Sequence, residues 1–310
     1  MSARFPMGHP YGWFHAAFSD ELMPGDVVPK KYFGRDLVLF RTESGQARVL
    51  DAFCPHLGAH LGYGGTVEGD ILACPFHSWR FDGEGVLVEV PYAKTQPDVL
   101  GRRCLKSWPV VETNRSIYVW YHPRNQQPAF DVTHMPELME AGEEWTALIT
   151  RQWTVHCHIQ EAHENILDAA HFRYVHGVDP DLQADFTGHQ SYISMAAKKP
   201  DGNGAATITE HNGPGQTWSR YTGFPEFIML NPVTPIDDEI AEFHVGVAFK
   251  RVIADKMPQV IDMVLEKIWE QIDSDIPIFE HKIYRTSPLY CDGDGPIEPF
   301  RQWYAQFYAA

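Results

Sequence analysis

Apolar and polar residues alternate along the second half of the chain in several short runs. In the run from residue 239 to 252 the apolar side chains fall at every second position, on one face of a β-strand: Ala241, Phe243, Val245, Val247 and Phe249. Residues 145–156 alternate in the same way, and weaker strand patterns cover residues 191–195, 205–210 and 227–230. Helix-forming segments separate and follow these runs. The pattern predicts an α+β domain in which helices pack on one side of an antiparallel sheet.

The first part of the chain has a different pattern, of short strands separated by turn residues. The β-rich runs cover residues 27–28, 36–41, 47–51 and 116–121, and the sequence at 82–85 predicts a hairpin turn. A polar segment that contains Pro follows at 125–128 and is the best linker candidate. We therefore predict an all-β domain over residues 1–125 and the α+β domain over residues 126–310.

The charge of the chain narrows its range of partners. It has 41 acidic and 25 basic residues, a formal net charge of −16, which opposes binding to phosphate backbones and to anionic lipid surfaces. The N-terminal segment contains no long apolar run, and the cysteines lack the spacing of a disulfide framework. We therefore expect a cytoplasmic protein that binds neither nucleic acid nor membranes.

Two short loops carry an ordered set of metal-binding side chains. Cys54-x-His56 and Cys74-x-x-His77 are separated by seventeen residues, so each loop offers one thiolate and one imidazole. Tetrahedral zinc accepts two sulfurs and two nitrogens, but zinc fingers usually pair Cys with Cys and His with His at each end. A two-iron cluster with Cys on one iron and His on the other needs each loop to reach both irons. Buried side chains that bind nothing are the simplest alternative.

The two loops resemble those of a Rieske [2Fe–2S] centre. In the Rieske subunits of respiratory complexes each loop holds an extra Cys, and the two form a disulfide; the matching positions here are Ala59 and Phe76. Those subunits also carry an N-terminal membrane helix, whereas the first residues of this sequence contain no apolar run that predicts one. The resemblance is therefore to the soluble oxygenase type of Rieske centre, and it implies that the two Cys and two His bind the cluster.

A second group of acidic and His residues follows in the second domain. On a continuous helix Glu164, Asp168 and His171 would share one face, because they fall at i, i+4 and i+7. His176 lies five residues beyond His171, about 140° around an ideal helix, so both imidazoles reach one metal only if the helix bends or ends between them. Without a metal, the same residues would form a solvated helix face.

A carboxylate that could complete this group comes from residues 260–278. Apolar residues recur there at every fourth position, as on the inward stripe of a helix: Val260, Val264, Ile268 and Ile272. Asp275 continues that stripe, whereas Asp273 is turned about 100° away. A carboxylate directed into an apolar interior is costly unless it is paired or bound to metal. Asp275 is therefore the predicted ligand and Asp273 the alternative, unless the acid at this helix end simply faces water.

The spacing Glu-x3-Asp-x2-His-x4-His resembles the mononuclear iron motif of Rieske non-heme iron oxygenases, and the resemblance extends from Gly12 to the C-terminus. It implies a helix-grip catalytic domain in which His171, His176 and one carboxylate bind Fe(II), with positions left open for O2 and substrate. It also implies a head-to-tail homotrimer in which Asp168 joins a cluster His of one subunit to an iron His of the next. Asn165, close to the iron, is expected to position O2 or a water.

Within this family, residues 275–282, 291–296 and 301–308 resemble the oxygenase component of 3-ketosteroid 9-alpha-hydroxylase and the cholesterol 7-desaturases. The resemblance implies a terminal oxygenase, a monooxygenase rather than a dioxygenase, that hydroxylates or desaturates an apolar steroid-like or sterol-like substrate. Electrons would come from a flavin-dependent reductase, directly or through a ferredoxin, to the cluster and then to the iron. The alternatives are an oxygenase for aromatic or heterocyclic substrates and a Rieske electron carrier. The long second domain argues against the carrier.

Overall fold

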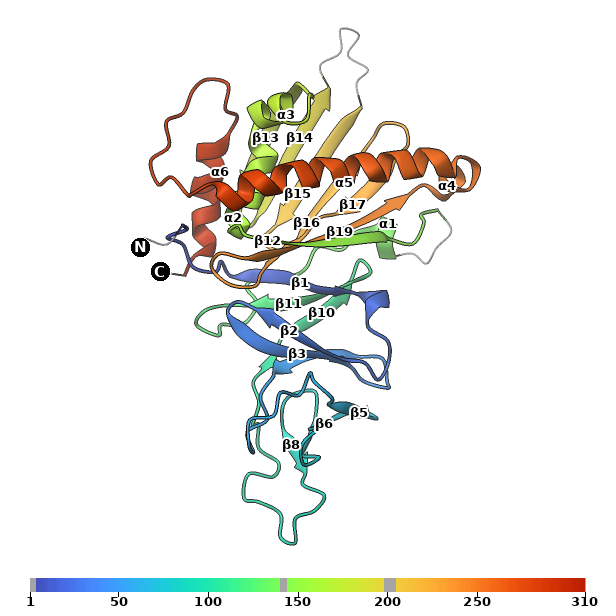
Figure 1. The fold of residues 1–310 in the computed structure, drawn as a ribbon, viewed down its shortest axis with the longest axis vertical. Helices are drawn as coiled ribbons and strands as arrows, with labels where there is room; N and C mark the ends of the chain where they lie inside the picture. The colour runs from blue at the N-terminus through green and yellow to red at the C-terminus, as the bar shows by residue number, and fades with distance from the viewer. Residues whose placement is uncertain (1–3, 140–143, 198–204, 310) are drawn as a thin grey trace. The chain divides into compact units, whose positions relative to one another are not determined.

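The computed structural model describes residues 4–139, 144–197 and 205–309. The chain divides into two compact units (Figure 1). The smaller unit contains His15–Tyr121 and Asn125–Pro128, and the larger contains Ala129–Ala310 together with Met1–Phe14 and His122–Arg124. The larger unit therefore includes an N-terminal segment that precedes the expected domain boundary, and the expected linker groups with the smaller unit.

The smaller unit is all-β, as the sequence predicts, and its strands form three small sheets. The first has the order β1-β11-β10, with β1 at Gly12–Phe18, β10 at Val110–Thr113 and β11 at Ser116–Tyr121. The first three residues of β1 belong to the larger unit. The second has the order β2-β3-β4-β9, at Val27–Tyr32, Arg35–Arg41, Ala47–Asp51 and Ser107–Trp108. The third has the order β5-β6-β7-β8, at Thr66–Glu68, Ile71–Ala73, Arg80–Phe81 and Leu87–Glu89.

Local sequence signals explain some of these strands better than others. The expected hairpin is confirmed, because β7 and β8 pair antiparallel and the Asp82 N–H donates to the Val86 carbonyl at 3.0 Å. The sequence pattern does not predict β1. All seven residues of this strand are buried, so it has no alternation of apolar and polar positions.

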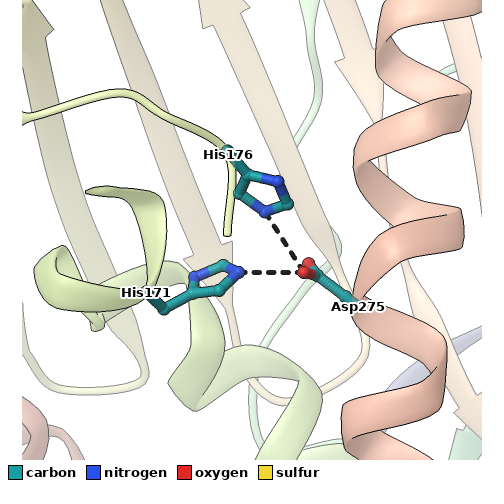
Figure 2. A group of neighbouring side chains, drawn as sticks. All are labelled: His171, His176 and Asp275. Atoms are coloured by element: carbon teal, nitrogen blue, oxygen red, sulfur yellow. Dashed lines mark hydrogen bonds and ion pairs between the residues drawn. The ribbon is translucent and has the colours of Figure 1, made fainter. Parts of the chain in front are cut away.

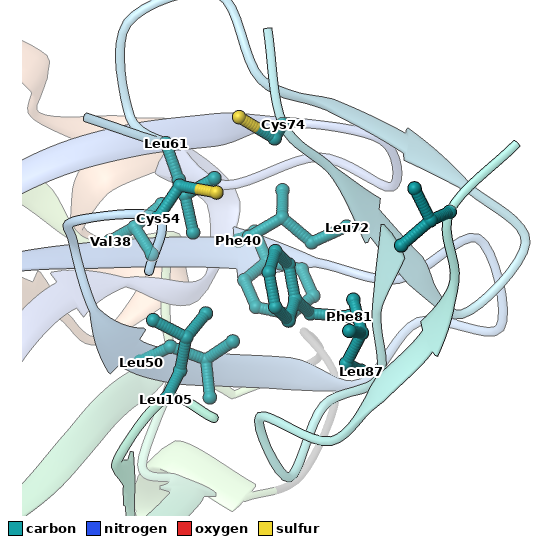
Figure 3. Close-up of a cluster of buried hydrophobic side chains, with 11 residues drawn as sticks. Val38, Phe40, Leu50, Cys54, Leu61, Leu72, Cys74, Phe81, Leu87 and Leu105 are labelled. Carbon is teal, nitrogen blue, oxygen red and sulfur yellow. The ribbon is translucent and has the colours of Figure 1, made fainter. Parts of the chain in front are cut away.

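The core of the smaller unit lies directly beneath the two Cys loops (Figure 3). Apolar side chains from the second and third sheets, among them Phe40, Leu72 and Phe81, pack there with no measurable exposure. Cys54 and Cys74 belong to the same buried cluster, and their sulfur atoms lie at its margin, directed toward each other (Figure 3). The β-sheets therefore hold both loops from below.

The larger unit is built on one eight-stranded antiparallel sheet. Its order is β12-β19-β17-β16-β15-β14-β13, and β18 also pairs with β19. The strands are β12 Ile149–Val155, β13 Pro180–Thr187, β14 Gln190–Ala197, β15 Ala206–Asn212, β16 Thr217–Tyr221, β17 Phe227–Leu230, β18 Val233–Pro235 and β19 Ala241–Phe249. Four of the five expected apolar positions of β19 are confirmed as buried, because Ala241, Val245, Val247 and Phe249 are at most 3% exposed, and Phe243 is partly buried.

Helices cover one face of this sheet, which confirms the α+β prediction (Figure 1). The α-helices are α1 Pro136–Met139, α2 Ile159–Glu164, α3 Ala169–Tyr174, α4 Arg251–Lys256, α5 Pro258–His281 and α6 Ile297–Tyr304. The 3₁₀ helices of the larger unit are η2 Asn165–Leu167 and η3 Ala305–Phe307, and η1 Ser19–Glu21 belongs to the smaller unit. Helix α5 packs on β19 through Ile261, Leu265 and Ile268, which recur at i, i+4 and i+7. Of the predicted stripe, Ile268 is buried, whereas Val260, Val264 and Ile272 are only partly buried. In the described residues, no helix is both long enough and apolar enough to span a bilayer.

Two ion pairs, each with a buried carboxylate, hold α2 in place. Arg301 of α6 donates from Nε and Nη2 to the two carboxylate oxygens of Glu164, each at 2.6 Å. Lys282, which follows α5, forms an ion pair with Glu161, whose side chain has no exposed surface. Bidentate Arg–carboxylate pairs fix orientation as well as distance. The C-terminal segment of the chain therefore sets the position of α2.

We predict that Arg301→Leu lowers the free energy of unfolding of the larger unit by about 3 kcal/mol, because it leaves the Glu164 carboxylate buried without its cation. Urea titration followed by far-UV circular dichroism measures this loss. Lys267→Leu is the matched control, since Lys267 pairs with Glu270 at the surface, where both side chains are at least 60% exposed. That change should cost at most about 0.5 kcal/mol. Equal losses in the two variants would contradict a structural role for the buried pair.

Candidate metal centres

The two Cys loops of the smaller unit have the same backbone hydrogen bonds. In each loop the Cys N–H donates to the carbonyl five residues later, at 2.8 Å, and its own carbonyl accepts from the N–H four residues later, at 2.9 Å for Cys54 and 3.0 Å for Cys74. The residue at that fourth position has a left-handed backbone, with φ 78° at Gly58 and 54° at Ser78. The matching turns present the two thiols in equivalent ways, although the His follows after one residue in the first loop and after two in the second.

The four predicted cluster ligands divide into a buried pair and a surface pair. Cys54 and Cys74 are 2% and 3% exposed. His56 and His77 are partly exposed, with ring centroids 4.8 Å apart and planes at 73°. The indole of Trp79 stacks on His56 at 4.7 Å, a contact that the sequence patterns do not predict. This arrangement suits a cluster with one sulfur-bound iron inside the domain and one imidazole-bound iron at its surface.

The environment of the thiols favours a bound metal. Burial raises the pKa of the Cys54 thiol to about 12, and the neighbouring Cys74 thiol adds to this effect. A thiolate at this position therefore needs a compensating cation, which coordinated iron supplies. The Nδ1 atom of His77 is buried and has no hydrogen-bond partner among the described residues. Two thiols and two imidazoles thus meet the chemical requirements of a Rieske cluster.

In the larger unit, the segment with the predicted iron ligands is broken twice. Helix α2 passes into η2 and stops at Asp168, where φ is −84° and ψ is 90°. The Asp168 carboxylate accepts from the His171 N–H at 3.0 Å and so caps α3. Helix α3 ends at Tyr174, before His176, which confirms the predicted end between the two His.

The first break corrects one expectation about this segment. Glu164, Asp168 and His171 do not share a continuous helical face, because the helix is interrupted at Asp168. Glu164 instead pairs with Arg301. The expectation was wrong because Asp favours the capping position, where its side chain competes with the backbone of a continuing helix. The break allows the segment to change direction before it reaches His171.

The two imidazoles meet Asp275 from helix α5 (Figure 2). The Asp275 Oδ1 atom lies 2.9 Å from His171 Nε2 and 3.2 Å from His176 Nε2. The three side chains are 7%, 4% and 14% exposed, in the order His171, His176, Asp275. One possible ligand atom from each side chain lies within 4.8 Å of the other two. The group is therefore compact enough to hold one metal ion.

The other candidate acid of α5 points elsewhere. Asp273 accepts a hydrogen bond from Trp153 Nε1 at 2.7 Å and forms an ion pair with Arg151 at 3.3 Å. Asp275 instead lies on the side of α5 that carries Ile268, seven residues earlier. The direction of the apolar face thus separates two acids that are only two residues apart.

The electrostatics of this group suit an iron ion. Burial lowers the pKa of His176, which keeps its imidazole neutral at physiological pH, the form that binds metal. Two imidazole nitrogens and one carboxylate oxygen are the donor set of non-heme Fe(II) oxygenases. His171 directs Nε2 at the carboxylate, and its buried Nδ1 lacks a partner in the described part of the chain. The residues present therefore fit the metal that the resemblance implies.

Two neighbouring polar side chains contact the candidate ligands. Asn165 Nδ2 donates to Asp275 Oδ2 at 3.0 Å and lies 3.4 Å from His171 Nε2, which places the predicted Asn165 beside the group. Ser274 Oγ lies 3.5 Å from His176 Nδ1, a contact that sequence reasoning does not predict. Its only sequence signal is its place next to Asp275. Asp168 accepts from the backbone N–H of His171, and among the described residues its carboxylate has no hydrogen bond to an imidazole.

Comparison with known proteins connects both centres to one family. Residues 12–109 match the Rieske [2Fe–2S] domain, and residues 119–308 match the 3-ketosteroid 9alpha-hydroxylase C-terminal domain. The second match covers more than half of the chain. The chain belongs to the 3-ketosteroid 9-alpha-hydroxylase family of Rieske oxygenases. It is therefore an enzyme, a terminal oxygenase component whose cofactors are a Rieske [2Fe–2S] cluster and a mononuclear non-heme iron. The electron-carrier alternative does not account for the matched C-terminal domain.

Individual relatives agree with this assignment. An oxygenase component of 3-ketosteroid-9-alpha-monooxygenase from Rhodococcus rhodochrous is 33% identical over 322 residues, which cover 96% of this chain and 83% of that protein. The cholesterol 7-desaturase nvd of Xenopus laevis is 29% identical over 343 residues, and the matched region covers 100% of this chain and 74% of that protein. Among solved structures, dicamba monooxygenase bound to dicamba has a TM-score of 0.76 at 19% identity, with 96% of both chains covered, which shows a common fold.

The two centres should be separable by mutation. We predict that Cys54→Ala abolishes the visible absorption of the cluster, because it removes a buried thiolate ligand. His171→Ala should keep that absorption and lose the mononuclear iron together with turnover. Absorption spectra, iron content and turnover of the purified variants measure these effects. His156→Ala, which changes an exposed His of the same unit, is the control and should behave as the wild type. Full turnover in His171→Ala would contradict the iron assignment.

Proposed function

We propose that this chain hydroxylates or desaturates an apolar steroid-like or sterol-like substrate, with Fe(II) held by His171, His176 and Asp275. In the same proposal the [2Fe–2S] cluster is held by two thiols and two imidazoles: Cys54, Cys74, His56 and His77. The observation that carries the proposal is the group of two imidazoles and one carboxylate within 4.8 Å of one another, inside a domain matched to steroid hydroxylases.

The chemistry assigned to the chain's own residues follows from their positions. His171, His176 and Asp275 would occupy one side of the metal and leave the remaining positions for O2 and substrate. Bound Fe(II) supplies the site at which O2 is reduced. Asn165 would hold the second carboxylate oxygen of Asp275 through its amide, and it could orient O2 or a water beside the metal. Neutral imidazoles and a hydrogen-bonded carboxylate keep the ligand set in one orientation.

Electron supply and assembly belong to the same proposal. An oxygenase component needs electrons from outside, which a flavin-dependent reductase would deliver directly or through a ferredoxin. We place the enzyme in the cytoplasm as a homotrimer. In it, Asp168 would connect a cluster imidazole of one subunit to His171 in the next. The partly exposed positions of His56 and His77 agree with electron exchange at the surface of the smaller unit.

The substrate class rests on the relatives. Those with higher sequence identity are named as acting on 3-ketosteroids and cholesterol. Solved structures of similar fold contain dicamba, caffeine or theobromine, but they share at most 19% identity with this chain. The steroid-like class is therefore preferred over aromatic or heterocyclic substrates.

A turnover screen tests this preference. The purified enzyme, with a flavin reductase and a ferredoxin, is given steroid ketones, sterols and aromatic acids, and products are identified by mass. We predict a steroid or sterol product that has gained one oxygen atom or lost two hydrogen atoms. Iron analysis of the same preparation should give three atoms per chain, two in the cluster and one mononuclear. Products from aromatic acids alone would contradict the steroid-like preference and support the alternative substrate class.

The proposed connecting role of Asp168 has a separate test. Asp168→Asn should keep both metals and the α3 cap, because Asn is as good as Asp at that position. It should nearly stop turnover, because the neutral amide lacks the charge that supports a ligand imidazole. Single-turnover oxidation of the reduced cluster, by rapid mixing with O2 and substrate, measures this coupling. Cluster oxidation at the wild-type rate in the Asn variant would contradict the role.

A further inference from the structure

The inner face of the large sheet carries a row of polar side chains where helices would ordinarily meet apolar ones. Ser191 of β14, His211 of β15 and Thr217 of β16 lie directly opposite one another in the strand register. All three are at most 4% exposed. Buried polar groups are costly unless they are hydrogen-bonded, so such a row needs a reason.

Part of this polar row is paired within the protein. His211 Nδ1 lies 2.8 Å from Ser191 Oγ, and His163 Nε2 of α2 lies 3.4 Å from Thr217 Oγ1. The two imidazoles are 4.9 Å apart between centroids, with planes at 73°. Each hydroxyl therefore contacts one nitrogen of one imidazole. The other nitrogen of each ring is left without a hydrogen-bond partner among the described residues.

Three polar atoms in this region have no hydrogen-bond partner among the described residues. They are His163 Nδ1, His211 Nε2 and the Tyr304 hydroxyl of α6. All three side chains are at most 1% exposed, and the ring of Tyr304 lies 6.1 Å from that of His163. An unmatched buried polar group costs about 1–3 kcal/mol, so three such groups together favour a ligand that supplies their partners.

The protonation of these groups defines what they can bind. Burial lowers the pKa of His163 well below its usual value and lowers that of His211 to about 3. Burial also raises the pKa of Tyr304 well above its usual value. At neutral pH the site therefore offers a phenol O–H and two neutral imidazoles, and it carries no charge. Such groups suit a neutral oxygen, a carbonyl or a hydroxyl, rather than an anion.

The surroundings of Tyr304 are apolar. Tyr304 belongs to a buried apolar cluster with Leu167, Ile193, Phe300 and Trp303. Leu167 lies in η2, which joins the two helices that carry His163 and His171. His163 itself is two residues before Asn165, the side chain that donates to Asp275. His163 therefore lies on the same chain segment as His171 and His176, whereas His211 and Tyr304 come from β15 and α6.

We propose that His163, His211 and Tyr304 form a polar anchor that hydrogen-bonds a carbonyl or hydroxyl oxygen of an otherwise apolar substrate. The anchor rests on the proposed function. It would recognise a part of the substrate that the iron ligands do not contact. Anchoring a remote oxygen fixes which carbon faces the metal, so these residues determine specificity. A neutral anchor also agrees with a steroid ketone or sterol and disfavours a carboxylate substrate.

Binding without turnover tests the anchor. The probes are the steroid ketone androstanone and its parent hydrocarbon androstane, and the readout is quenching of tryptophan fluorescence in the absence of reductant. We expect the wild type to bind the ketone about tenfold more tightly than the hydrocarbon, the value of a good hydrogen bond in a buried site. Tyr304→Phe removes only the hydroxyl and should bring the ratio of the two dissociation constants close to one.

A second variant and a control separate recognition from packing. His211→Gln should lower the same ratio, since it replaces the imidazole of the anchor. Ser219→Ala changes a buried hydroxyl on the same sheet face that is already paired with Thr209 at 2.9 Å, and it should leave the ratio unchanged. The anchor is wrong if both anchor variants keep the wild-type ratio, if the wild type binds both probes equally, or if it binds neither. Iron content and turnover are measured separately, so a failure of the oxygenase assignment remains distinguishable.

Discussion

The meeting of one carboxylate with two imidazoles is the contact on which the larger unit depends. Asp275, His171 and His176 are largely withdrawn from water, and one oxygen of Asp275 lies within 3.2 Å of both rings. They come from distant parts of the chain, so helix α5, the capped turn at Asp168 and the end of α3 must all be placed correctly. The apolar face of α5 on β19 and the Arg301–Glu164 pair provide that placement.

In the smaller unit, loops rather than helices position the candidate metal ligands. Two turns with the same hydrogen bonds hold two thiols above one apolar core, and the imidazoles lie closer to solvent. The burial that makes a free Cys54 thiolate unfavourable also shields a metal-bound one from water. In both units, buried polar atoms need a ligand that the protein chain alone does not supply. The same reasoning leads from the iron ligands to the unpartnered groups around Tyr304.

The candidate metal ligands can be proposed from the sequence because each lies in a short, regular pattern. The ligand spacing of the loops and the apolar stripe of α5 are local features, and the stripe separates Asp275 from Asp273 without knowledge of the fold. The break at Asp168 is harder to predict, since helix propensity alone favours continuation. Strand β1 is missed because it is buried on both faces, and β16 because two consecutive polar residues, Ser219 and Arg220, interrupt its pattern. The polar row at His211 cannot be predicted from the sequence, because its residues come from three strands and lie side by side only through the register of those strands.

We propose that one chain holds a [2Fe–2S] cluster and a mononuclear iron with the ligands named above. Anomalous diffraction at the iron absorption edge, from crystals of the iron-loaded protein, tests this most directly. We expect one isolated iron peak within coordination distance of His171, His176 and Asp275, and a pair of peaks between the two Cys loops. An isolated peak bound by Asp273 in place of Asp275, or the absence of a peak beside the two imidazoles, would contradict it.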